Sequence, residues 1–332
     1  MTSATPGTVI GCWSLANTNA TPAESHLPIG PQADAIETPL ADDSRIKVRP
    51  GDIQPGGKYY PIVKLQIRYE KQPPSDSRWA QGTGWLIKPD LIVTAGHCAF
   101  DHTYNFGKAV RIRAYVGYSG KEFINQKGVQ FRTGVKIATP NEWITSDINR
   151  ANDVSLIQVD KPFNHVDPIT YVPTTTFVDN VKLGVVGYPG DKTYKDEAAA
   201  EMYEMFKQTT YDLSKTNPNM LEYTISSFGG KDSSSSLRIE SANLICCLGQ
   251  SGSPVIISGE NISIGAHVYG LGTKNSASFV RGKYGNYFPE ITSAMHSSDP
   301  VTTTADGINY FHIQNAFKEQ TDELPSTERE AS

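Results

Sequence analysis

Cysteine is scarce in this chain, and no long apolar run is present. The four cysteines stand at positions 12, 98, 246 and 247, too few and too unevenly spaced for a disulfide framework or a paired CxxC zinc site. No stretch approaches the ~20 apolar residues of a membrane-spanning helix, and residues 1–30 lack the basic start and apolar core of a secretory signal. A net charge of −5 supplies no basic field for phosphate backbones. We therefore expect no membrane and no nucleic-acid partner, and the redox compartment stays open.

The composition is that of a turn-rich globular chain. Its 332 residues can bury one large core or two smaller ones, and 28 glycines, 21 prolines and 16 tyrosines favour β structure. Short apolar or alternating runs recur between turn clusters, at Ile62–Tyr69, Gly84–Ile87, Leu91–Ala95, Val110–Val116, Val154–Val159, Val181–Gly187, Leu221–Phe228, Pro254–Ile257 and Ile262–Val268. These runs predict an all-β, antiparallel architecture. One exception is Asp196–Gln208, where Met202, Met205 and Phe206 at helical spacing predict a surface helix.

The two ends of the chain differ from its middle. Residues 1–37 are rich in Thr, Ala, Pro and Asn without periodicity, which predicts a disordered leader or propeptide. The polar and charged residues 317–332 predict a disordered tail. The folded part is therefore expected between residues 38 and 316.

A histidine and an aspartate each stand at the end of an apolar run. His97 follows the strand-like residues 91–94 and two small residues, so another segment can approach its ring closely. Asp153 stands at the start of the run 154–159, where it could accept the histidine Nδ1–H. Taken singly, such a histidine is more often structural than catalytic, and such an aspartate is commonly a turn residue.

A glycine-flanked serine is the third element. In Gly249–Pro254 (GQSGSP), the glycines permit a tight turn that exposes Ser251 and lets backbone N–H groups converge as an oxyanion hole requires. A Gly/Ser turn without function is the alternative. The three elements together, in the order His, Asp, Ser, are much less expected by chance than any one of them.

The motifs TAGHC, NDVSLI and GQSGSPV resemble the His, Asp and Ser motifs of the trypsin-like serine proteases. More narrowly, Asp42–Val48 (DDSRIKV), Gly187–Lys192 (GYPGDK) and Ile264–His267 (IGAH) resemble segments of the glutamyl endopeptidases. The likeness spans residues 42–287 and implies two antiparallel Greek-key β-barrels, over 38–165 and 166–316, with the active site between them.

The resemblance assigns roles to individual residues. Ser251 would be the nucleophile, His97 the general base and then acid, and Asp153 the orienting carboxylate. The backbone N–H groups of Ser251 and Gly249 would bind the oxyanion. His267 would hydrogen-bond the carboxylate of the residue before the cut, which implies cleavage after Glu and less readily after Asp. Otherwise His267 is a packing residue and the specificity differs.

Two departures from the family pattern bear on these roles. Trypsin-like enzymes usually pair the cysteine after the catalytic histidine with one in a nearby strand, but 81–87 offers none, so Cys98 is expected to be free. The acidic residue that trypsin carries six positions before its serine is replaced by Ile245. Trypsin's own specificity is therefore not expected.

The serine turn is interrupted when compared with the family. The glutamyl endopeptidase pattern has a Ser or Thr five positions before the nucleophile, but Cys246 stands there. Removing Lys231–Gly249 puts Ser227 in that place and Gly230 at the oxyanion position. Gly230-Lys231 can be encoded GGT AAG, with a splice donor, and Leu248-Gly249 CTA GGN, with an acceptor. We interpret 231–249 as an in-frame intron, with a tolerated surface insertion as the alternative.

The sequence thus predicts a serine endopeptidase, with two alternatives: a protease of the same fold with another specificity, or an inactive binding module. We expect no cofactor and no metal, a monomer, and protein or peptide substrates with an acidic residue before the cut. The resemblance suggests an extracellular enzyme, although no signal is visible. Cleavage after Glu37 could mature a zymogen, or residues 1–37 are a passive end.

Overall fold

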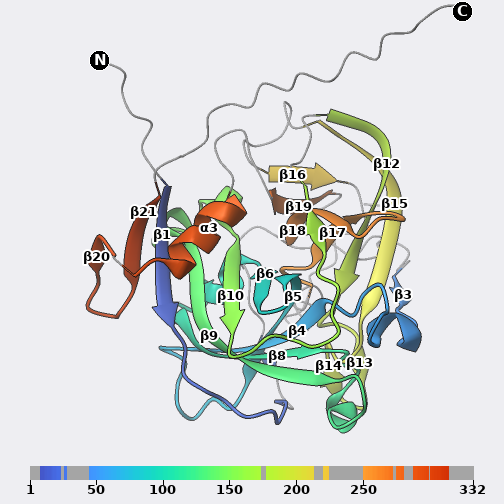
Figure 1. Ribbon diagram of the computed structural model, residues 1–332, viewed down its shortest axis with the longest axis horizontal. Coiled ribbons are helices and arrows are strands. Elements are labelled where there is room, and N and C mark those ends of the chain that lie inside the picture. Colours follow the sequence, from blue (N-terminus) through green and yellow to red (C-terminus); the bar gives the residue numbers. More distant parts are fainter. Residues whose placement is uncertain are drawn as a thin grey trace, which may run out of the picture.

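β-Strands make up most of the computed structural model, which describes residues 8–23, 26–27, 45–172, 177–212, 220–223, 250–271, 274–279, 287–298 and 300–313 (Figure 1). The strands are β1 (Thr8–Ser14), β2 (His26–Leu27), β3 (Ile46–Lys47), β4 (Ile62–Tyr69), β5 (Trp79–Lys88), β6 (Leu91–Thr94), β7 (Phe100–Asp101), β8 (Gly107–Val116), β9 (Gln130–Pro140), β10 (Ser155–Val159), β11 (Thr170–Tyr171), β12 (Phe177–Gly187), β13 (Thr193–Tyr194), β14 (Glu197–Ala198), β15 (Tyr203–Asp212), β16 (Met220–Tyr223), β17 (Pro254–Ile257), β18 (Ile262–Leu271), β19 (Lys274–Phe279), β20 (Thr302–Thr303) and β21 (Asn309–Ile313). Short helices lie between them: α1 (Gly96–Ala99), α2 (Asn141–Thr145), α3 (Tyr287–His296), and 3-10 turns at Pro50–Ile53, Lys121–Phe123 and Arg150–Asn152. Over the described ranges, none of the helices has the length and apolarity needed to cross a membrane.

A closed barrel forms from six antiparallel strands. The hydrogen-bonded order is β9, β10, β6, β5, β4, β8, and β8 pairs with β9 to complete the ring. Alternate side chains of β4 (Val63, Leu65 and Ile67) are fully buried, as an apolar run in a barrel wall requires. The strands expected at 62–69, 91–95, 110–116 and 154–159 all lie in this barrel. The all-β fold class is confirmed.

A second sheet forms from the later part of the chain. Its strand order is β16, β19, β18, β17, β12, β15, β3. Strand β16, at one edge, also contacts β15, near the other edge, so the sheet curves back on itself. A separate core fills it, including Leu183, Val185, Met205, Leu221 and Val255. The ladders within both sheets are antiparallel, apart from the parallel pairs β2 with β5 and β11 with β18.

The N-terminal strand β1 lies inside the first sheet. It pairs with β9 on one side and β21 on the other, and Gly11 stands opposite both Thr139 and Tyr310. Ile10, Cys12 and Trp13 are buried, and burial of one large apolar side chain contributes about 1.5–3 kcal/mol. The prediction of a disordered leader over 1–37 is therefore wrong for 8–14. The apolar run there is short, and the polar residues on both sides of it dominate the composition of the segment, so the composition did not indicate a strand.

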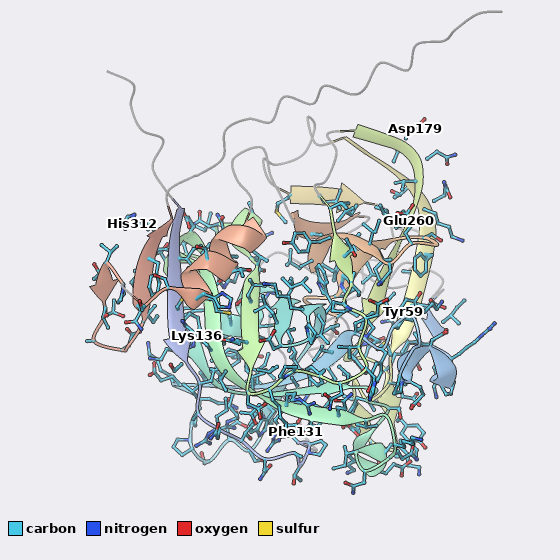
Figure 2. The ribbon with its side chains drawn as sticks, in the orientation of Figure 1. Tyr59, Phe131, Lys136, Asp179, Glu260 and His312 are labelled. Atoms are coloured by element: carbon cyan, nitrogen blue, oxygen red, sulfur yellow. The ribbon has the colours of Figure 1, made fainter. Side chains whose placement is uncertain are left out.

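The C-terminal part of the chain returns to the first barrel. β21 pairs with β1, and α3 packs on β1, β9, β10 and β21 (Figure 1). Lys136 of β9 lies beside α3, where its Nζ donates a hydrogen bond to the carbonyl oxygen of Met295 (Figure 2). The predicted second domain, 166–316, is therefore wrong for 287–313. The predicted tail 317–332 and the insertion 231–249 lie outside the described residues.

The expected helix over Asp196–Gln208 is also wrong. This region forms β14 and the start of β15, which pairs with β12 along most of its length. Met202, Met205 and Phe206 have helical spacing, but β15 gains a long hydrogen-bonded ladder with β12. This pairing partner lies outside the segment, so the local spacing did not reveal it.

Lys64 of β4 is a buried charge near the boundary between the two sheets. Its side chain is 0% exposed, and Nζ donates a hydrogen bond to the Ala199 carbonyl oxygen at 2.6 Å. Burial lowers the pKa of Lys64 to about 7, although the Glu197 carboxylate opposes the shift. Because the folded pKa lies below the unfolded value of about 10.4, the stability linked to this group is present above pH 10 and is lost as pH falls through about 7.

We predict that Lys64→Met abolishes this pH dependence. Between pH 7 and 10 the wild-type free energy of unfolding should rise, relative to that of the variant, by up to roughly 1.4 kcal/mol per pH unit. The variant should be the more stable protein at pH 7, since methionine removes the buried charge and leaves only one carbonyl without its donor. Denaturant unfolding at several pH values measures this, with the exposed Lys161→Met as control. Parallel curves for wild type and Lys64→Met would show that Lys64 does not titrate in this range.

Candidate active site

Strand β6 positions His97. All four residues of β6 are buried, and the chain then turns through Ala95 into α1, where His97 is 3% exposed. The hydroxyl of Tyr69 on β4 donates a hydrogen bond to the His97 carbonyl oxygen at 3.0 Å. The backbone that carries the imidazole is thus held by β6 and by β4, two strands of the barrel that lie on either side of β5.

Asp153 lies directly against His97. It follows the 3-10 turn at 150–152, precedes β10, and is 0% exposed. One carboxylate oxygen, Oδ1, accepts the backbone N–H of His97 at 2.8 Å, and Oδ2 lies 2.9 Å from the ring Nδ1. A carboxylate in this position favours the neutral tautomer with its proton on Nδ1, which leaves Nε2 as the basic atom.

Gly96 makes this approach possible. A Cβ atom added at Gly96 would lie 3.0 Å from Asp153 Oδ1 and 2.9 Å from Cδ1 of Trp143. Both distances are shorter than ordinary carbon contacts, so a larger residue would push the carboxylate or the indole away. The two small residues before His97 predicted such a close approach, and the structure confirms it.

The serine turn is tied to the same barrel strands. The Ser251 carbonyl oxygen accepts the N–H of Thr83 on β5 at 3.0 Å. Gly252 has φ +87°, and a Cβ there would lie 2.2 Å from the Thr83 carbonyl oxygen and 2.9 Å from the Ala95 backbone nitrogen. Only glycine fits this position. The turn that carries Ser251 therefore packs on the backbone two residues before His97.

His267 of β18 lies on the other side of the turn. Its carbonyl oxygen accepts the Gly252 N–H at 2.7 Å, and its own N–H donates to the Ser253 carbonyl oxygen at 2.8 Å. The side chain is 1% exposed. Burial, and then the charge of His97, lower the pKa of His267 to about 4. The ring is therefore neutral near pH 7, where it can donate one hydrogen bond without leaving a buried charge.

The protein family described as Trypsin matches residues 62–287 of this chain. The chain belongs to the trypsin family. A glutamyl endopeptidase of Bacillus licheniformis is 24% identical over 175 residues, 49% of this chain and 47% of the relative. An extracellular metalloprotease of Bacillus subtilis is 27% identical over 185 residues, 50% of this chain and 53% of the relative. The matched region thus covers only about half the length of these two curated relatives.

Solved structures agree on the fold of this trypsin-family chain. A Glu endopeptidase in complex with MPD has a TM-score of 0.53 at 21% identity, over 77% of this chain and 97% of that one. At this identity the similarity supports the fold alone. Within the described ranges, no group of three or more His, Cys, Asp or Glu side chains is arranged to hold a metal ion.

The structure brings together most of the residues singled out in the sequence. His97 and Asp153 are hydrogen-bonded to each other, and the turn that carries Ser251 is hydrogen-bonded to the backbone of His267 in β18. Cys98 is free and buried, as expected from the missing partner cysteine. Gly249 and Ser227 lie outside the described residues. Their predicted roles stay predictions.

Trp143 is a neighbour of the site that is not among the residues predicted from the sequence. This buried side chain lies on α2, with its ring centroid 6.4 Å from that of His97. Its Nε1–H donates to the Phe100 carbonyl oxygen at 3.1 Å, and its own carbonyl oxygen lies 2.7 Å from His102 Nε2. Two features of the sequence could have indicated this contact: the aromatic Trp143 stands shortly before Asp153, and Gly96 leaves space beside His97.

Proposed function

We propose that this protein is a serine endopeptidase that works through an acyl-enzyme. The observation that carries the proposal is the double hydrogen bond between Asp153 and His97, beside a glycine turn that holds Ser251 against the same strands. Membership of the trypsin family supports it. An orienting carboxylate, a base and an adjacent hydroxyl are the groups that this chemistry requires.

The reaction follows from the roles of these groups. Ser251 Oγ attacks the scissile carbonyl carbon while His97 Nε2 takes the hydroxyl proton, and the C–N bond then breaks as Nε2 passes that proton to the leaving amine. A water molecule next attacks the acyl carbon, gives its proton to Nε2, and the serine–acyl bond breaks as Ser251 recovers a proton. The carboxylate of Asp153 stabilises the imidazolium formed in both halves.

We further propose that the enzyme cuts after Glu, and less readily after Asp. A neutral His267 in an enclosed position could donate a hydrogen bond to a substrate carboxylate, and its low pKa keeps the empty pocket uncharged. The similarity to a glutamyl endopeptidase supports this choice. Ser227 is the proposed second donor, on the strength of the family resemblance.

Two measurements test the proposal. A fluorophosphonate probe should label the wild-type chain and leave Ser251→Ala unlabelled, whereas an inactive binding module would not react in either form. Peptides that differ only in Glu, Gln or Leu before the cut should show a preference for Glu, and His267→Ala should reduce that preference roughly 10- to 100-fold. The exposed His165→Ala is the matched control. Equal cleavage after Gln or Leu would reject the Glu specificity and leave the peptidase proposal intact.

A further inference from the structure

The segment at residues 8–27 lies outside the part of the chain that matches the trypsin family, which begins at residue 62. Its described residues, 8–23 and 26–27, nevertheless belong to the first sheet or contact it. β1 separates β9 from β21, and β2 adds a parallel pair to β5, with Leu27 opposite Ala80. A segment with neighbours on both sides cannot leave without breaking two ladders.

The side chain nearest to Gly11 connects β1 with α2. A Cβ added at Gly11 would lie 2.4 Å from Ile144 Cδ1, so β1 and α2 are packed with no room between them. Ile144 follows Trp143, and Trp143 lies against Gly96 beside His97 and Asp153. The backbone of β1 therefore sets the depth at which α2 holds the indole against the catalytic pair.

A second connection runs through β9. Gly11 and Cys12 pair with Thr139 and Ala138 of β9. Thr139 Oγ1 in turn donates to the Val154 carbonyl oxygen at 2.8 Å. Ser155 Oγ donates to the Ala138 carbonyl oxygen at 3.0 Å. Both hydrogen bonds hold the two residues that directly follow Asp153, so the same two residues of β9 contact β1 on one side and the chain next to the carboxylate on the other.

Hydrogen bonds hold the rest of the segment on the barrel. Trp13 Nε1 donates to the Ala109 carbonyl oxygen at 2.8 Å, and the Arg113 guanidinium donates to the Asn19 carbonyl oxygen at 3.0 Å. Further along, the Tyr115 hydroxyl donates to the Ala20 carbonyl oxygen at 2.9 Å. These donors come from β8 and from β1 itself, and they fix residues 8–20 independently of the chain that follows.

We propose that residues 8–27 are a permanent positioning element of the His97–Asp153 pair, which stays bound when the chain is cut between residues 28 and 44. The proposal rests on the proposed function, since it assigns the segment a part in that site. It also changes the meaning of cleavage after Glu37. Such a cut yields an enzyme of two non-covalently associated chains and does not release a propeptide.

The first test cuts the folded full-length chain. A recognition sequence for a specific protease is placed between residues 28 and 44, and the cut protein is passed over a sizing column in native and in denaturing buffer. We expect the N-terminal piece to elute with the rest of the protein in native buffer and apart from it in denaturant. We also expect the cut protein to keep its fluorophosphonate labelling and the low-field proton resonance of the His97 Nδ1–H hydrogen bond. Release of the piece with both signals unchanged would overturn the proposal.

The second test moves α2 without cutting the chain. Gly11→Val pushes on Ile144, and we expect about 10²-fold lower kcat/KM with a smaller change in KM, together with a shifted low-field resonance and pH profile. The double variant Gly11→Val/Ile144→Ala restores the space and should recover most of the activity. Ser14→Val, which puts the same side chain at an exposed position of β1, is the control. An unchanged resonance and kcat/KM in folded Gly11→Val would contradict the positioning role.

The resonance and the column profile separate this proposal from the proposed function. Neither readout depends on Ser251. If the wild-type chain gives no labelling, the peptidase proposal fails, while the retention of the N-terminal piece and the His97–Asp153 resonance still decide whether residues 8–27 position the pair. If Gly11→Val does not fold, the cut protein provides both readouts.

Discussion

Replacing Asp153 with asparagine is expected to lower turnover about 10⁴-fold and to leave the chain folded. In the wild-type protein Oδ1 accepts the His97 backbone N–H at 2.8 Å and Oδ2 lies 2.9 Å from the ring Nδ1. Asparagine keeps one oxygen for the backbone contact but presents an NH₂ group to Nδ1. The ring then favours the tautomer with its proton on Nε2, which cannot take the serine proton. Because the volume is unchanged, we expect unfolding to remain cooperative.

The measurement is kcat and KM for one peptide substrate, with thermal unfolding of the same preparations. Asp167→Asn changes an exposed carboxylate between β10 and β11 and should leave both quantities near their wild-type values. If Asp153→Asn retains turnover within about tenfold of wild type, His97 does not depend on this carboxylate as a base. A variant that is merely unfolded would be recognised from its unfolding curve.

Excision of Lys231–Gly249 is expected to raise activity by about 10²- to 10³-fold, the usual effect of gaining one oxyanion-hole donor. In the full chain the residue two positions before Ser251 is Gly249, at the end of the inserted stretch, and we expect the insertion to misplace its N–H as an oxyanion donor; in the shortened chain the residue is Gly230, which follows the family pattern. Excision also puts the hydroxyl of Ser227 five positions before the nucleophile, in place of the Cys246 thiol. The gain should therefore appear in kcat and in the preference for Glu.

Both chains are compared with and without Ser251→Ala, so that any activity independent of the nucleophile is subtracted. A fluorophosphonate labelling rate that is equal in the two chains would show that the serine turn forms with the nineteen residues in place. The transcript gives an independent answer. Uniform inclusion of codons 231–249 in messenger RNA would reject the intron interpretation even if the shortened chain were the more active one.

His97, Asp153 and Ser251 could be singled out as candidates because small residues stand beside His97 and Ser251 and an apolar run follows Asp153, while their roles were assigned by the family resemblance. Two small residues before His97 allow the close approach of Asp153, and the glycine after Ser251 adopts a backbone angle that other residues rarely reach. The contribution of Trp143 could not be found in this way. Its contact with His97 depends on where α2 lies, and α2 packs on β1 and β9.

The sequence by itself determined the all-β class, five of the eleven strands of the first sheet and four of the eight strands of the second, the free Cys98 and the order in which the catalytic candidates occur. Those properties depend on alternation, turn residues and glycine positions within a few residues of one another. Only the tertiary structure decided that Thr8–Ser14 is a strand and that Tyr203–Asp212 is a strand where helical spacing had predicted a helix. In both cases the stabilising partner lies outside the segment itself: β15 pairs with β12, and β1 is completed by β21, about three hundred residues away, and such a ladder leaves almost no trace in either segment alone.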